Sequence, residues 1–242
     1  MPESTTDRPS APDARKDQDP EFVHRAFSSI ARRYVLTNHF LSLGIDVLWR
    51  RRVASFVAEV KPGRVLDVAT GSGDLAAVVG KACPEARVIG MDFCAPMLAE
   101  ARRRGLEDLV VADGLALPLP DASVDAVTIG YGLRNMADWS AGLEEFARVL
   151  KPGSRLVILD FSLPSAAWLR KPYRWYLHRV LPAVAGLLTG NSDAYVYLGE
   201  SIERFPSGEA MSQLVRANGF ASCRWLPLMG GISSVYVADK EA

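Results

Sequence analysis

Two aspartates, separated by a glycine-rich turn, are the residues of this chain whose types and spacing could do chemistry. The segment RVLDVATGSGD places Asp67 in an apolar run and Gly71 and Gly73 in the turn that follows. A second apolar run, VIGMD, ends at Asp92, 19 residues after Gly73. Glycine allows close approach of backbone to a ligand, and an acid that ends the second strand can accept both hydroxyls of a ribose. This pattern predicts a site for a cofactor that contains adenosine.

The spacing of the glycines also discriminates between cofactors. A dinucleotide site favours three glycines as G-x-G-x-x-G, whereas Gly71-Ser72-Gly73 is followed by Asp74-Leu75-Ala76. The cradle for a pyrophosphate is therefore incomplete. A loop that holds only the carboxylate and amine of an amino acid needs less, because a helix N-terminus offers free N–H groups and Asp67 can meet an ammonium. We therefore expect S-adenosylmethionine (SAM) rather than a nicotinamide dinucleotide.

Further polar residues follow the third and fourth apolar runs. A carboxylate at Asp113 can accept a hydrogen bond from the amine of adenine, and the small Gly114 leaves space for the ring. An ordinary turn acid is the alternative interpretation of Asp113. Arg134 and Asn135, in the segment YGLRN, either face the site or cap the next helix, and both interpretations stay open.

The elements that must position these residues alternate along the chain. Hydrophobic patterns predict strands at 64–69, 87–91, 108–112, 124–130 and 155–161, and helices at 74–82, 95–104 and 139–150. Such alternation is typical of parallel βαβ units. A helix over 207–218 and a hairpin of strands near 221–228 and 232–238 follow. The prediction is an α/β fold with a doubly wound, mostly parallel seven-stranded sheet that contains one antiparallel strand.

Length and composition favour one folded domain. With 242 residues, of which 49% are hydrophobic, the chain can bury one substantial core. We expect a disordered tail over 1–20 and a single domain over 21–242 that begins with helices. An aromatic, basic and proline-punctuated insertion, 163–206, interrupts the alternation and could cover a substrate.

Charge and cysteine usage narrow the function classes. A formal net charge of zero does not indicate a nucleic-acid partner, and the basic run Arg50-Arg51-Arg52 is interpreted as a solvated helix face. Three cysteines and three histidines show no metal-ligand spacing, so we expect the protein to bind no metal and to work in the reducing cytoplasm. No apolar run approaches the roughly 18–20 residues of a membrane span, and the N-terminus lacks the apolar core of a signal peptide.

Five stretches of the chain carry a family resemblance. They read FSSIARRYVLTNHFLSLGIDVLWRR, VLDVATGSGD, ALPLPDASVDAVTIGYGLRN, RVLKPGSRLVILDFSLP and YVYLGESIERFP. From about residue 25 to its end, the chain resembles the quinone-biosynthesis C-methyltransferases that act on demethylmenaquinone and on the benzoquinol precursor of ubiquinone. The resemblance implies a Rossmann-like class I methyltransferase that binds SAM through Ser72, Asp92, Asp113 and Gly114.

The resemblance further implies methylation of a prenylated quinol ring, with demethylmenaquinol as the expected acceptor. Two departures from the family pattern keep other acceptors open: Val35 follows Tyr34 where the family has Tyr-Asp, and Tyr236 stands where it has a histidine. The alternatives are the ubiquinone precursor or another small molecule on the same scaffold. A non-catalytic SAM-binding subunit and a nicotinamide dehydrogenase are alternatives from other classes.

Arg134 and Tyr34 are the expected catalytic residues. Methyl transfer to carbon requires alignment of the reacting atoms and stabilisation of a developing phenolate. Arg134 suits the electrostatic role, because a guanidinium with a pKa above about 12 is a poor base, and Tyr34 would orient the ring. The insertion is expected to accommodate the isoprenoid tail, either as a packed lid or resting on an anionic bilayer. Peripheral membrane contact and a homodimer are both compatible with the sequence.

Overall fold

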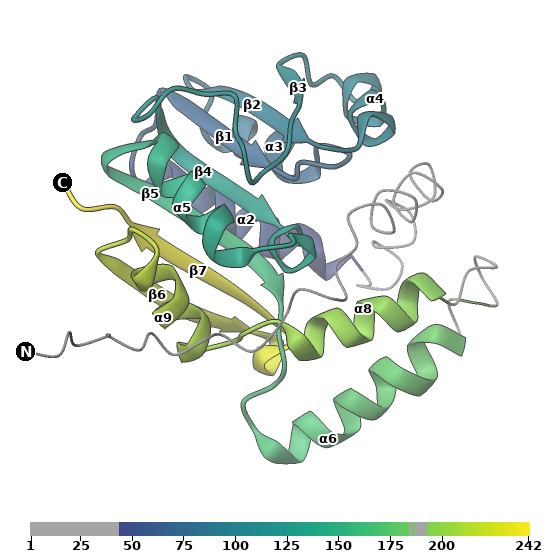
Figure 1. Ribbon diagram of the computed structural model, residues 1–242. Helices are drawn as coiled ribbons and strands as arrows, with labels where there is room; N and C mark the ends of the chain where they lie inside the picture. Colours follow the sequence, from purple (N-terminus) through teal and green to yellow (C-terminus); the bar gives the residue numbers. More distant parts are fainter. Residues whose placement is uncertain (1–43, 184–185, 187–192) are drawn as a thin grey trace, which may run out of the picture.

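The computed structural model describes residues 44–183, 186 and 193–242 (Figure 1). Their seven-stranded sheet has the order β3-β2-β1-β4-β5-β7-β6. The strands are β1 (Arg64–Val68), β2 (Arg87–Asp92), β3 (Leu109–Val111), β4 (Val124–Gly130), β5 (Leu150–Phe161), β6 (Ser222–Leu228) and β7 (Ser233–Asp239). Strand β7 runs antiparallel to both of its neighbours, and every other pair is parallel. The predicted mostly parallel sheet with one antiparallel strand is confirmed.

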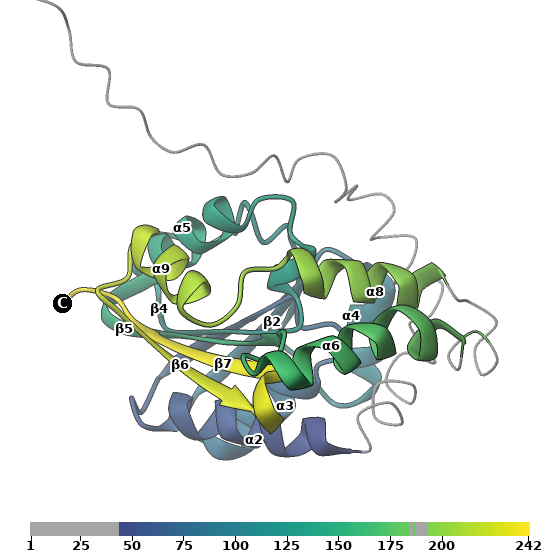
Figure 2. The ribbon, with the colours of Figure 1, turned by 90° about the horizontal axis from the view of Figure 1, so that it is seen from below.

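Helices cover both faces of this sheet (Figure 2). The α-helices of the described residues are α2 (Ile45–Ala58), α3 (Asp74–Ala82), α4 (Ala95–Arg103), α5 (Trp139–Val149), α6 (Ala167–Trp175), α8 (Asp193–Arg204) and α9 (Glu209–Ala217). Helices α2 and α3 pack on one face, and α5 and α9 pack on the other. The predicted tail, 1–20, and the start of the predicted N-terminal helices, 21–43, lie outside the described residues.

Two apolar layers result from the alternation of side chains along the central strands. In β1, Leu66 and Val68 join the core beneath α5 and α9, whereas Val65 joins the core beneath α2 and α3. A strand buried on both faces needs a nearly continuous apolar run. This requirement explains why the sequence predicted β1, β2 and β4 to within about a residue.

Strand β5 begins earlier than the sequence predicted. Leu150 already pairs with Val124, and the register then shifts so that Arg155 pairs with Ala126. The intervening turn residues belong to this irregularity, in which Gly153 has a φ of 71°. Positive φ favours glycine, and here it lies at a bulge within the strand, upstream of the start that the apolar run predicted.

The predicted insertion, 163–206, contains α6, a π-helical turn over Tyr176–Val180, and α8. Helices α6 and α8 lie side by side beyond the end of the sheet (Figures 1 and 2). The segment has a small core of its own, formed by Leu177, Leu181, Tyr195 and Ile202. Helix α6 buries none of its residues. Within the described ranges, no helix has the length and apolar character needed to cross a bilayer.

Candidate functional site

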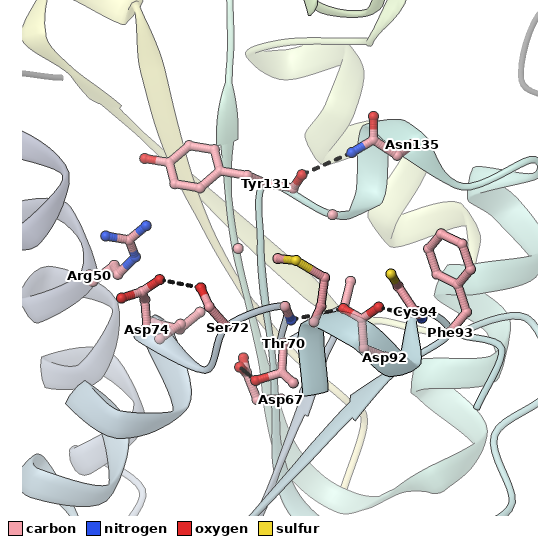
Figure 3. Close-up of a pocket in the computed structure, with 16 residues that line it drawn as sticks. Arg50, Asp67, Thr70, Ser72, Asp74, Asp92, Phe93, Cys94, Tyr131 and Asn135 are labelled. Carbon is pink, nitrogen blue, oxygen red and sulfur yellow. Dashed lines mark hydrogen bonds between the residues drawn. The ribbon is translucent and has the colours of Figure 1, made fainter. Parts of the chain in front are cut away.

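A pocket opens at the carboxyl ends of β1, β2 and β4 (Figure 3). Its empty volume, which includes open solvent at the mouth, is about 720 Å³. The strand order reverses between β1 and β4, which is where ligands bind in doubly wound sheets. Its walls come from α2, from the ends of these three strands and the loops after them, and from the first turns of α3 and α4: Arg50, Asp67, Ala69, Thr70, Gly71, Ser72, Asp74, Leu75, Asp92, Phe93, Cys94, Met97, Gly130, Tyr131, Gly132 and Asn135.

The loop after β1 takes its shape from residues with positive φ. Ala69, with φ 50°, precedes Gly71 and Gly73, with φ 58° and 79°. Gly71 lines the pocket, and its backbone N–H donates to Asp92. Gly73 is not among the lining residues, and a Cβ there would clash with the side chain of Leu106. The two glycines therefore differ, because Gly71 shapes the pocket wall and Gly73 allows the loop to pack beside α4.

Asp92, at the end of β2, holds its carboxylate in a fixed orientation. The backbone N–H of Gly71 donates to Oδ2 and that of Cys94 to Oδ1, each at 2.8 Å. These two backbone bonds set the direction in which the carboxylate faces at the end of β2. This arrangement suits a ribose, as the sequence predicted.

Asp67, at the carboxyl end of β1, is a buried acid held by neutral donors. The hydroxyls of Thr70 and Thr128 donate to its two oxygens, each at 2.6 Å. Burial raises the pKa of Asp67 to about 6, although these hydroxyls favour its charged form. A positively charged ligand would stabilise the carboxylate. The site is therefore matched to a ligand that carries a cation.

Arg50, on α2, lies at the end of the pocket away from Asp92 (Figure 3). It is only 8% exposed, and it forms an ion pair with Asp46, four residues earlier on the helix. Arg51 and Arg52 are exposed. The interpretation of this run as a solvated face is therefore wrong for Arg50. The missed signal was helical spacing, since Arg50 lies on the same face as the apolar Val53 and Val57.

The other predicted cofactor residues lie in two places. Ser72 lines the pocket, and its hydroxyl donates to Asp74 at 2.7 Å. Asp113 is exposed and accepts the N–H of Leu115 at 2.9 Å, which is the contact of a turn acid. A Cβ on Gly114 would lie 2.5 Å from Cε of Met136. Neither Asp113 nor Gly114 is among the described residues that line the pocket.

Arg134 is buried one layer behind the pocket. Its Nη1 donates to Oδ1 of Asp160, at the end of β5, at 2.8 Å, and also to the backbone carbonyl of Tyr131. Its own backbone N–H donates to Oδ2 of Asp160 at 3.3 Å. The next residue, Asn135, does line the pocket, and its side chain donates to the same carbonyl of Tyr131. Arg134 thus supports the turn that forms one wall, while Tyr34 lies outside the described residues.

Tyr236, one of the departures from the family pattern, is a core residue. It is 1% exposed on β7, and its hydroxyl accepts the backbone N–H of Gly208 at 2.9 Å. Burial raises the pKa of Tyr236 to about 12, so that it stays neutral at physiological pH. Tyr236 therefore anchors the segment before α9.

The residues present fit SAM. Asp92 holds an oriented carboxylate at the strand end where a ribose would lie, and the buried carboxylate of Asp67 suits a cationic ligand. The sheet order and this site are typical of the class I SAM-dependent methyltransferases. Solved structures share the fold. A SAM-dependent methyltransferase from Thermotoga maritima superposes with a TM-score of 0.63 at 19% identity, covering 90% of this chain and 99% of that one. Human N-acetylserotonin methyltransferase in complex with SAM superposes with a TM-score of 0.61 at 17% identity, covering 95% of this chain and 64% of that one.

Sequence comparison defines the family more closely. The model of the ubiE/COQ5 methyltransferase family matches residues 13–240, and the chain belongs to this family. A demethylmenaquinone methyltransferase from Thermus thermophilus is 49% identical over 88% of this chain and 99% of its own length. Another, from Deinococcus radiodurans, is 44% identical over 93% of this chain and 95% of its own length. The predicted family and methyltransferase activity are thereby confirmed, with SAM as the methyl donor.

Proposed function

We propose that this protein methylates a ring carbon of a demethylmenaquinol. The observation that carries the proposal is its likeness to relatives named demethylmenaquinone methyltransferase, which extends over nearly the full length of both chains. Bound SAM supplies a methyl group on a positively charged sulfur. The pocket supports this chemistry, since it combines a ribose acceptor at Asp92 with a buried carboxylate at Asp67.

In this proposal, the pocket residues act mainly by binding and orientation. Asp92 and Gly71 hold the ribose side, Ser72 lies on the loop between, and Asp67 attracts the cationic part of the donor. Alignment of reactants and exclusion of water can account for several kcal/mol of a barrier. Asp113 and Gly114, which follow β3, would meet the adenine on the outer side of the pocket.

Arg134 would act through the turn that it supports. Its ion pair with Asp160 fixes Tyr131 and Asn135, which both line the pocket. Its positive charge, close behind that wall, would also favour a developing phenolate. Tyr34 keeps its proposed role of orienting the acceptor ring.

The exposed face of α6 supports a peripheral contact with a membrane. Trp168 and Trp175 are 78% and 65% exposed, and the neighbouring Lys171 and Arg179 are exposed too. Aromatic and basic side chains on one surface helix suit an anionic lipid surface. In a flotation assay with phosphatidylglycerol vesicles, replacing both tryptophans by serine should abolish binding of the full chain. Vesicle binding that is absent in the wild type, or unchanged in the variant, contradicts this part.

Turnover of defined acceptors tests the proposed reaction. The purified full chain, SAM and a detergent-solubilised prenylated demethylnaphthoquinol should give a product heavier by one methylene, measured by mass spectrometry. A prenylated benzoquinol of equal tail length is the matched competitor, and we expect the naphthoquinol to react faster. Asp92→Ala should abolish the reaction through loss of SAM binding, with Asp121→Ala, an exposed acid outside the pocket, as the control. Exclusive reaction with the benzoquinol would favour the ubiquinone precursor instead.

A further inference from the structure

The arginine at the end of the pocket has no role in the proposed reaction. Arg50 is the one pocket-lining residue with a permanent positive charge among those the structure describes. Arginine is rarely buried without a partner, and here Asp46 supplies one through Nη1. The described hydrogen bonds of Arg50 involve only that nitrogen, which leaves Nε and Nη2 as further donors.

The surroundings hold the guanidinium in place. Asp46 lies one turn away on α2, and the centre of the Tyr131 ring is 5.9 Å from the guanidinium carbon. Asp74 is the other acid near Arg50. Burial alone would raise the pKa of Asp74, but hydrogen bonding by Arg104 and the charge of Arg50 lower it. Since Asp74 is already bridged by Arg104 at 2.6 Å, Arg50 is not its main counterion.

The positions of the charged groups along the pocket match the parts of SAM. Asp92 lies at one end, Asp67 beneath the middle and Arg50 at the opposite end (Figure 3). A ribose at Asp92 leaves the amino-acid part of SAM to extend toward α2. That part carries a carboxylate, and guanidinium groups bind carboxylates through paired, charge-assisted hydrogen bonds.

We propose that Arg50 binds the carboxylate at the amino-acid end of SAM and so selects complete donors over decarboxylated ones. The assignment rests on the proposed function only for the identity of the donor. In this proposal the three consecutive arginines differ in role, since Arg50 faces the ligand whereas Arg51 and Arg52 face solvent.

Calorimetric titration of the full chain with two probes tests the proposal. The probes are S-adenosylhomocysteine and its decarboxylated analogue, S-adenosyl-3-thiopropylamine, which lacks only the carboxylate. We expect the wild type to prefer S-adenosylhomocysteine by about tenfold or more, equivalent to about 1.4 kcal/mol. Arg50→Gln should remove most of this preference, because it should lower the affinity for S-adenosylhomocysteine and leave that for the decarboxylated analogue unchanged. Arg50→Lys should restore part of it, because a lysine keeps the charge but not the fork.

Arg51→Gln is the matched control and should bind both probes as the wild type does. Equal affinity of the wild type for the two probes overturns the proposal without any variant. So does an Arg50→Gln protein in which both affinities fall together, since that result indicates a structural role. A wild type that binds neither probe contradicts the donor assignment itself, which distinguishes that failure from failure of the role of Arg50.

Discussion

Two buried arginine–aspartate pairs lie near the pocket, and they differ in what they leave exposed to a ligand. The Arg134–Asp160 pair joins the turn after β4 to the end of β5, with side chains 4% and 0% exposed. The Arg50–Asp46 pair lies within α2, with side chains 10% and 5% exposed, and its arginine lines the pocket. Burial alone therefore does not identify a functional arginine. The position of the guanidinium relative to the pocket wall does.

The bonding around each aspartate explains the difference. Asp160 accepts the backbone N–H of both Arg134 and Phe161 as well as the guanidinium, so its pair joins the turn after β4 to the end of β5. Asp46 and Arg50 are four residues apart on one helix, so their pair constrains little beyond side-chain orientation. The first pair is part of the scaffold, and the second is a support for one side chain.

The largest expected effect is on the first pair. Arg134→Ala would leave the carboxylate of Asp160 buried without its cation, which typically costs about 3–5 kcal/mol. The free energy of unfolding in urea should fall by that amount, and SAM turnover should fall more than SAM affinity. An unchanged free energy of unfolding with lost turnover would contradict a scaffold role and make Arg134 a direct participant. Asp160→Asn is the paired control and should also destabilise the fold.

The second pair should contribute less to stability. In Arg50→Met, the apolar stem is kept and Asp46 loses its ion pair beside an open pocket, where water can replace part of the lost bonding. We expect a loss of about 1–3 kcal/mol in the same urea experiment. A loss as large as that of Arg134→Ala would remove the distinction between the two pairs.

The contrast also shows where sequence reasoning succeeded. Asp67, Gly71 and Asp92 were predicted from local pattern and Ser72 from the family resemblance. All four line the pocket, because a strand end and the turn after it are fixed by nearby residues. Strand positions followed from apolar runs for the same reason. The start of β5 did not, since its first pairing depends on the partner strand.

Residues whose position depends on tertiary packing were predicted less well. Arg50 reaches the pocket because α2 packs against α3 and the sheet, which the run of three arginines does not reveal. The motif around Arg134 was recognisable, but its ion pair with Asp160 joins residues 26 positions apart. The positive φ of Gly73 could be anticipated from the turn, but the closeness of Leu106 to that glycine depends on tertiary packing.

Asp67 extends the comparison to a buried acid whose described hydrogen bonds come from neutral groups. Its pKa of about 6 predicts that binding of a cationic donor requires loss of a proton at lower pH. The affinity for S-adenosylhomocysteine, measured by calorimetry, should therefore fall by up to about tenfold for each pH unit below pH 6. In Asp67→Asn this pH dependence should disappear. A wild-type affinity that is flat between pH 7 and about pH 5 would contradict the role of Asp67.

The raised pKa of Asp67 also makes the stability of the folded protein depend on pH. Because the folded pKa of Asp67 lies above its ordinary value of 3.8, the folded state binds the proton more tightly. Its contribution to stability is fully present below pH 3.8 and is lost as the pH rises through about 6. The ligand-free protein thus carries an uncompensated acid at neutral pH, which a cationic donor would compensate.

The smallest expected effect is that of Arg51→Gln, and it tests whether contact or general charge explains Arg50. Arg51 is exposed, so its loss should change the free energy of unfolding by less than about 0.5 kcal/mol. If Arg51→Gln lowered the affinity for S-adenosylhomocysteine as much as Arg50→Gln does, the long-range field of the positive charges on α2 would be the cause. Salt separates the two explanations, because at 1 M ionic strength the Debye length is about 3 Å and an exposed charge is screened. A contact of Arg50 with the ligand carboxylate should persist there.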